Sequence, residues 1–145
     1  MEPRISLVTL GVSDLERAVA FYRDGLGFPT TYKPGDPVAF FNTGGARLAV
    51  FPRAELAHDI GPHTPTEQAG FSGISLAHNV RTEAEVAAVL ELAAAAGGAI
   101  IKPAQEIFFG RHGYFSDPDG YYWEVAWNPS FPLAADGMIQ LTPLS

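Results

Sequence analysis

Apolar and polar residues at the start of the chain follow a strand-then-helix pattern. Residues 5–12 are rich in apolar and β-branched side chains and lead into Ser13 and Glu16, which have the spacing of a helix capping box. The apolar residues that follow recur at helical spacing on one face: Leu15, Ala18, Val19, Tyr22 and Leu26. Gly25 and Gly27 are typical of a helix end. The pattern predicts a strand over 5–12 and a helix that starts after Ser13.

Three short apolar segments after this helix predict strands. They cover residues 30–33, 38–43 and 47–51. Gly44 and Gly45 separate the last two segments, as in a hairpin turn. The first half of the chain is therefore predicted to have the order β-α-β-β-β.

The same order of signals returns roughly seventy residues later. Residues 74–80 predict a strand, Thr82 and Glu85 form a second capping box, and Gly97 ends the helix. The apolar face of this helix is made by Val86, Val89, Leu90 and Ala93. Three further strands are predicted at 99–102, 113–116 and 121–127, the last two joined by the turn sequence Asp117-Pro118-Asp119-Gly120.

The repeated pattern predicts an α+β fold of two tandem βαβββ modules within a single domain, 1–145. Four segments are expected: module one at about 4–52, a linker at 53–70 with one helical turn at 55–59, module two at about 71–128, and an irregular tail at 129–145.

Composition and charge limit the classes of partner. The chain has 145 residues and a formal net charge of −7, and its nine Lys and Arg residues are scattered, so we expect no nucleic-acid partner. The absence of cysteine excludes disulfides and thiolate metal ligands. No apolar run approaches the roughly 20 residues of a membrane span, and no signal-peptide pattern follows Met1. We therefore expect a cytoplasmic protein with no membrane partner.

Two motifs and the repeat together resemble the vicinal oxygen chelate superfamily, which includes glyoxalases, bleomycin-resistance proteins and dioxygenases. The motifs are residues 10–22, LGVSDLERAVAFY, and residues 115–124, FSDPDGYYWE. The likeness covers about residues 4–128. It implies that the two modules form a cup-shaped mixed sheet with helices on its outer face. It also implies a homodimer, because superfamily members commonly cover open sheet edges with a second chain.

The resemblance also indicates where metal-bearing members hold a divalent ion. The corresponding positions in this chain are Leu7, Ala49, Gly73 and Glu124. Only Glu124 carries a donor atom, and a single carboxylate is a poor site for Zn²⁺, Ni²⁺ or Fe²⁺. We therefore expect no metal and no other cofactor.

Strand alternation predicts which side chains line the cup, because residues two apart share a face. If Glu124 points inward, the same face of module two also carries Tyr122, Ser116, Tyr114, His112 and, from the opening strand, Ser75. Module one adds Thr9, Phe41 and Arg47. The fosfomycin-resistance members of the superfamily are similar in placing a ligand-contacting tyrosine at the position of Tyr114.

Glu124, Tyr114 and His112 are the candidate catalytic groups. Glu124 is either a general acid or base, or a partner for a cationic ligand, or a structural carboxylate bonded to Tyr114 or Arg47. His112 is either a base near neutral pH or a half-exposed residue without a role. The candidate ligand-binding residues are Thr9, Phe41, Arg47, Ser75, Ser116 and Tyr122.

Three functions are compatible with these residues. The first is a metal-independent isomerase or lyase that acts on a small organic molecule with Glu124 as acid or base. The alternative is a non-catalytic protein that sequesters a drug or metabolite, resembling the bleomycin-resistance proteins. A metal-dependent lactoylglutathione lyase or extradiol dioxygenase is disfavoured, because three of the four ligand positions lack donor atoms. All three require a small-molecule ligand.

Overall fold

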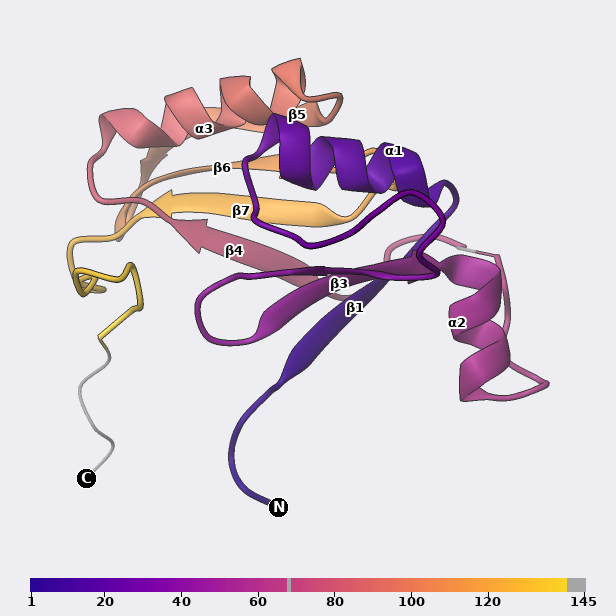
Figure 1. The fold of residues 1–145 in the computed structure, drawn as a ribbon. Helices are drawn as coiled ribbons and strands as arrows, with labels where there is room; N and C mark the ends of the chain where they lie inside the picture. The colour runs from indigo at the N-terminus through magenta and orange to yellow at the C-terminus, as the bar shows by residue number, and fades with distance from the viewer. Residues whose placement is uncertain (68, 141–145) are drawn as a thin grey trace. The chain divides into compact units, whose positions relative to one another are not determined.

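The computed structural model describes residues 1–67 and 69–140 (Figure 1). The chain divides into two compact units, Met1–Gly73 and Ile74–Ser145, so the boundary falls just before the first predicted strand of module two. Among the described residues, no helix is long and apolar enough to cross a membrane.

The first unit contains a mixed three-stranded sheet in the order β1-β3-β2. β1 (Leu7–Val12) pairs in parallel with β3 (Arg47–Pro52), and β2 (Ala39–Phe41) is antiparallel to β3. A parallel pair requires a crossover connection, and the helical segments α1 (Leu15–Val19) and η1 (Ala20–Gly25) lie in it. The predicted strand, helix and final hairpin of module one are therefore present.

The first helix begins one residue later than the capping-box prediction. Asp14, and not Ser13, is the N-cap, and its carboxylate accepts a hydrogen bond from the Arg17 backbone N–H at 3.0 Å. The Ser13 hydroxyl instead accepts one from the Arg17 guanidinium at 2.9 Å. The helix then widens into the π-helical turn η1 and ends before Gly27, whose φ of 79° suits glycine.

The predicted strand at residues 30–33 is reduced to one bridge between Thr30 and Phe41. Side-chain bonds hold this segment instead of a backbone ladder. The Thr30 hydroxyl donates to the Phe40 carbonyl at 2.7 Å and accepts from the Tyr32 N–H at 3.1 Å. The Tyr32 hydroxyl donates to the Glu16 carboxylate, which ties the segment to α1.

Phe41 lies in the core of the first unit, so its predicted place on the face of Arg47 and Ala49 is wrong. It pairs with Leu48 in the β2–β3 register and is 1% exposed. Its ring centroid is 5.5 Å from that of Tyr22 in η1. The preceding Phe40 pairs with Ala49 and is 52% exposed, because a shift of one residue moves a side chain to the opposite face.

The predicted linker contains a full helix instead of one turn. α2 (Arg53–Ile60) follows directly on β3 and packs against β1 and β3. Gly11 permits close packing here, because a Cβ at this position would meet Arg53 atoms at 3.2–3.3 Å. The Arg53 guanidinium donates to the Gly11 carbonyl at 3.1 Å.

The second unit contains a four-stranded sheet in the order β4-β7-β6-β5. β4 (Ser75–Asn79) is parallel to β7 (Tyr122–Trp127), and β6 (Gly110–Ser116) is antiparallel to both β7 and β5 (Ala99–Ile107). α3 (Ala84–Ala95) packs on β5, β6 and β7, as the ribbon shows (Figure 1). This unit has the predicted β-α-β-β-β order.

The turn between β6 and β7 fixes the register of the two central strands. The Asp117 carboxylate accepts hydrogen bonds from the N–H groups of Asp119 at 3.0 Å and Tyr121 at 2.8 Å. Gly120 has a φ of 85°, which glycine adopts without strain. Ser116 pairs with Tyr122 directly after the turn, and this pair sets the partners of all other residues along the β6–β7 hairpin.

The two faces of the second sheet are assigned by Gly113. A Cβ on Gly113 would lie 2.6 Å from Leu90 Cδ1 in α3, so this position faces the helix. Phe115 and Trp123, which share its alternation, stack with ring centroids 5.9 Å apart and are almost fully buried. Tyr114, one residue away, therefore projects from the face away from α3. We call this face the helix-free face.

Candidate functional site

Tyr114 and Glu124 meet on the helix-free face. They are direct partners across the β6–β7 pair, and the Tyr114 hydroxyl donates a hydrogen bond to Glu124 Oε2. The shared face that strand alternation predicted for these two residues is thus confirmed. The hydrogen bond is compatible with both a functional and a structural carboxylate, so the atoms around the second oxygen, Oε1, matter more.

Glu124 keeps the Tyr114 phenol in its neutral form. The hydrogen bond to the carboxylate is the main cause, and burial and the negative charge act in the same direction, so that the pKa of Tyr114 rises to about 12. A phenol with this pKa remains a proton donor throughout the physiological range. Tyr114 therefore holds and orients the carboxylate without becoming an anion itself.

Tyr114→Phe should remove this donor and leave the ring in place. We expect a loss of about 1.5 kcal/mol of stability at neutral pH, the lower end of the range for a hydrogen bond to a charged group, because Tyr114 is only partly buried. A raised pKa stabilises the fold below the unfolded value near 10, and this contribution is lost as the pH rises towards 12. The difference between the two proteins should therefore shrink over that window. Urea unfolding at pH 7, 10 and 11.5 measures it.

Tyr32→Phe is the matched control, because Tyr32 also donates to a glutamate, Glu16, in the first unit. Both variants lose a Tyr–Glu bond, and only Tyr114→Phe should alter ligand binding. If wild type and Tyr114→Phe bind ligand equally well, Tyr114 is not part of the ligand-binding site.

His112 lies beside this pair and is more buried than the sequence indicated. It is opposite Ala126, 5% exposed, and packs edge-on against the rings of Phe109 and Tyr114 at 5.7 and 5.6 Å. Its Nδ1 lies 3.9 Å from Glu124 Oε1. Neither ring nitrogen has a hydrogen-bond partner among the described residues. Burial of an imidazole whose nitrogens lack hydrogen-bond partners costs free energy.

Lys102 on β5 is a site residue that the sequence analysis missed. It pairs with Tyr114, and its Nζ lies 5.6 Å from the centre of the Tyr114 ring. The only available signal was a single lysine after the apolar run Ala99-Ile100-Ile101. Its face could not be derived, because the β5–β6 register shifts on both sides of it.

Three other predicted residues lie next to one another on the helix-free face, on neighbouring strands. Tyr122 on β7 pairs with Ser116 on β6 and with Ser75 on β4, so all three share the alternation of Glu124. Ser116 is 9% exposed, while Ser75 is exposed. These positions remain candidate ligand-binding residues beside Tyr114 and Glu124.

The residues predicted in the first unit are only partly on one face. Thr9 pairs with Ala49, and Leu7 pairs with Arg47, so these four share an alternation on β1 and β3. Arg47 is exposed at the start of β3. Phe41 is excluded from this face, as described above.

The donor set does not fit a bound metal ion. The β4 partner of Glu124 is Ala77, and the first-unit positions Leu7 and Ala49 also lack donor atoms. Within residues 1–67 and 69–140, no group of three or more His, Asp or Glu side chains could hold a metal. Glu124 with His112 supplies at most two ligands, and a tetrahedral site requires more.

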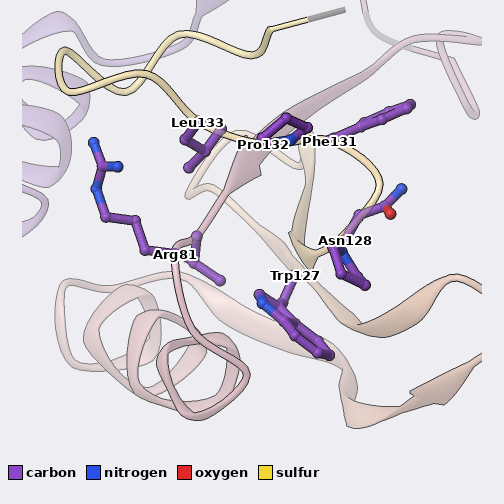
Figure 2. A pocket seen from close by; sticks show the side chains of 8 residues that line it. Arg81, Trp127, Asn128, Phe131, Pro132 and Leu133 are labelled. Carbon is purple, nitrogen blue, oxygen red and sulfur yellow. The ribbon is translucent and has the colours of Figure 1, made fainter.

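A separate pocket of about 240 Å³ lies where β7 passes into the tail (Figure 2). Arg81 is held at its edge by the carbonyls of Ala134 and Ala135, at 2.9 and 3.1 Å. None of the predicted site residues lines it; its walls are Val80, Arg81, Trp127, Asn128, Pro129, Phe131, Pro132 and Leu133. It is therefore distinct from the Tyr114–Glu124 pair.

The family model described as the Glyoxalase/Bleomycin resistance protein/Dioxygenase superfamily matches residues 4–125. The chain belongs to this superfamily. The family and the α+β fold predicted from the sequence are thus confirmed. A comparison with curated proteins found no match.

Solved structures agree with membership of the glyoxalase superfamily. A glyoxalase-related enzyme from Fulvimarina pelagi is 35% identical, with a TM-score of 0.85 over 97% of this chain and 99% of that chain. A lactoylglutathione lyase from Agrobacterium tumefaciens is 25% identical, with a TM-score of 0.64 over 88% and 95% of the two chains. TioX from Micromonospora sp. ML1 is also 25% identical, with a TM-score of 0.60 over 83% and 95%.

Proposed function

We propose that this glyoxalase-superfamily protein binds a small organic molecule on the helix-free face and transfers a proton on it without a metal. The observation that carries the proposal is the arrangement of Glu124, with Oε2 held by Tyr114 and Oε1 directed towards the buried, unpartnered His112 at 3.9 Å. The Glu124 side chain is 24% exposed, so a ligand can reach it. The 35% identity to a glyoxalase-related enzyme also favours catalysis.

The proposed step is general base catalysis at a carbon next to a carbonyl group. Glu124 Oε1 removes the proton, and the electron pair of the C–H bond becomes part of an enolate. In an isomerase that acts on a 2-hydroxy carbonyl compound, the hydroxyl proton moves to the enolate oxygen, and Glu124 returns its proton to the former carbonyl carbon, so that the carbonyl and hydroxyl groups exchange places. In a lyase, the enolate pair forms a C=C bond to the next carbon, the group on that carbon leaves with the electrons of its own bond, and the proton passes from Glu124 to solvent. His112 Nδ1, 3.9 Å from Oε1, is placed to exchange the proton with Glu124.

A non-catalytic ligand-sequestering protein of the bleomycin-resistance type is the second candidate. Its support is the Tyr114 hydrogen bond, because a carboxylate held by a phenol is also a good receptor for a cationic ligand. The formal charge of −7 acts in the same direction.

Deuterium exchange separates the two candidates. The chelator-treated protein is incubated in D₂O with a panel of small ketones, 2-oxo acids and amines, and ligands are first selected by thermal shift. We expect C–H exchange, followed by NMR, in at least one bound ketone. Binding of amines alone, without exchange in any compound, would support sequestration. Exchange only after addition of Zn²⁺, Ni²⁺ or Mn²⁺ would contradict a metal-independent mechanism.

We also propose a homodimer. Four strands lie at sheet edges, β1 and β2 in the first unit and β4 and β5 in the second, and uncovered edges promote association. Large apolar side chains such as Ile101 and Phe108 are also exposed. Sedimentation equilibrium at micromolar concentration should give twice the mass of 15.5 kDa. A monomer at this concentration would contradict the proposal.

A further inference from the structure

Lys102 is a cation on the helix-free face that contacts an aromatic ring. It is half-buried, lies on β5 beside the ring of Tyr114, and makes no ion pair with any carboxylate in the described parts of the chain. The chain has only one other lysine, Lys33, which is exposed in the first unit. Partial burial of a cation that forms no ion pair costs free energy, so an anion at this place would be stabilised.

Opposite charges flank Tyr114 across three neighbouring strands. Lys102, Tyr114 and Glu124 are successive register partners on β5, β6 and β7. Neighbouring strands are about 4.8 Å apart, so the outer two backbones are separated by roughly 10 Å. The Lys102 ammonium lies over the ring of Tyr114, and the Glu124 carboxylate accepts the hydrogen bond from the Tyr114 hydroxyl. Both charges therefore lie close to the same tyrosine, and a short molecule can contact both.

We propose that the ligand of this site is a short-chain organic acid that carries a carbonyl group, such as a 2-oxo acid. Its carboxylate pairs with Lys102, and its acidic C–H lies at Glu124 Oε1. The charges orient the molecule, because Glu124 repels the carboxylate end and Lys102 attracts it. The proton-transfer role of Glu124 rests on the function proposed above, whereas the pairing of Lys102 with the carboxylate does not.

Isothermal titration at low ionic strength tests the pairing with pyruvate and 2-oxobutyrate and their neutral methyl esters. Wild type should bind each acid more tightly than its ester. Lys102→Met, which keeps most of the length of the side chain and removes its charge, should weaken acid binding about tenfold and leave ester binding unchanged. Lys33→Met is the matched control and should bind like wild type.

Equal affinity of Lys102→Met and wild type for the acids, or equal affinity of wild type for acids and esters, would overturn the inference. A wild type that binds neither acid would overturn it as well. Selective loss of acid binding in Lys102→Met without deuterium exchange in any protein would support the acid-binding site and reject the catalytic function. Exchange in neutral ketones that is insensitive to Lys102→Met would support the catalytic function and reject the acid-binding site.

Discussion

Glu124→Gln should lower the rate of deuterium exchange into a bound ketone by about 10² to 10⁴-fold, the usual contribution of a general base. Glutamine has nearly the same shape, and its carbonyl oxygen can still accept the hydrogen bond from Tyr114, so the strand pair should stay intact. The amide cannot accept a proton from carbon at neutral pH. Exchange rates at saturating ligand, measured by NMR for both proteins, give the ratio.

Glu91→Gln is the control for the loss of one negative charge, because Glu91 is exposed on α3. It should exchange at the wild-type rate. An unchanged rate in Glu124→Gln, with ligand binding confirmed by titration, would leave Glu124 as a structural residue. Loss of binding in Glu124→Gln without any exchange in wild type would instead support a receptor for cationic ligands.

Gly113→Ala should destabilise the protein by about 3 kcal/mol, in the range expected for a buried steric conflict. A Cβ on Gly113 would lie 2.7 Å from the Lys102 carbonyl oxygen and 3.2 Å from the Ala104 N, both backbone atoms of β5. It would also lie 2.6 Å from Leu90 Cδ1. The leucine can rotate away, whereas β5 can move only by loosening its pairing with β6. Urea unfolding compares the free energies of unfolding.

Gly61→Ala is the matched glycine control. Gly61 has an extended backbone, and the only atom near an added Cβ is Thr64 Oγ1 at 3.9 Å. It should change stability by less than about 0.5 kcal/mol. An equally mild effect of Gly113→Ala would show that β5 shifts freely over Gly113 and that its backbone does not fix Lys102 beside Tyr114.

The site pair was predictable because a short turn fixes its register. The Asp117–Gly120 sequence joins two strands with few unpaired residues, so the alternation of Glu124 transfers directly to Tyr114 and His112. The same alternation places Trp123 on the opposite face, where it is 7% exposed. Side-chain period and turn chemistry are both local properties, and the sequence contains them.

Other positions depended on information that local patterns do not carry. Phe40 and Phe41 are equally apolar, and the packing of Tyr22 and Phe28 decides which of them enters the core. Ser13 and Asp14 are both favourable N-cap residues, so the sequence alone does not decide which of them caps the helix. Lys102 follows a register shift in β5, which breaks simple alternation.

The irregular pairing of β5 also affects how chains can associate. Pro103 has no N–H to donate, and the register shifts between Ile100 and Lys102 and between Lys102 and Gln105. The exposed side chains of Ile100 and Ile101 would otherwise make this outer strand a template for the repeated addition of chains beyond a dimer. An interrupted ladder cannot propagate a continuous intermolecular sheet, so the apolar β5 edge is protected from fibril-like growth by its own backbone.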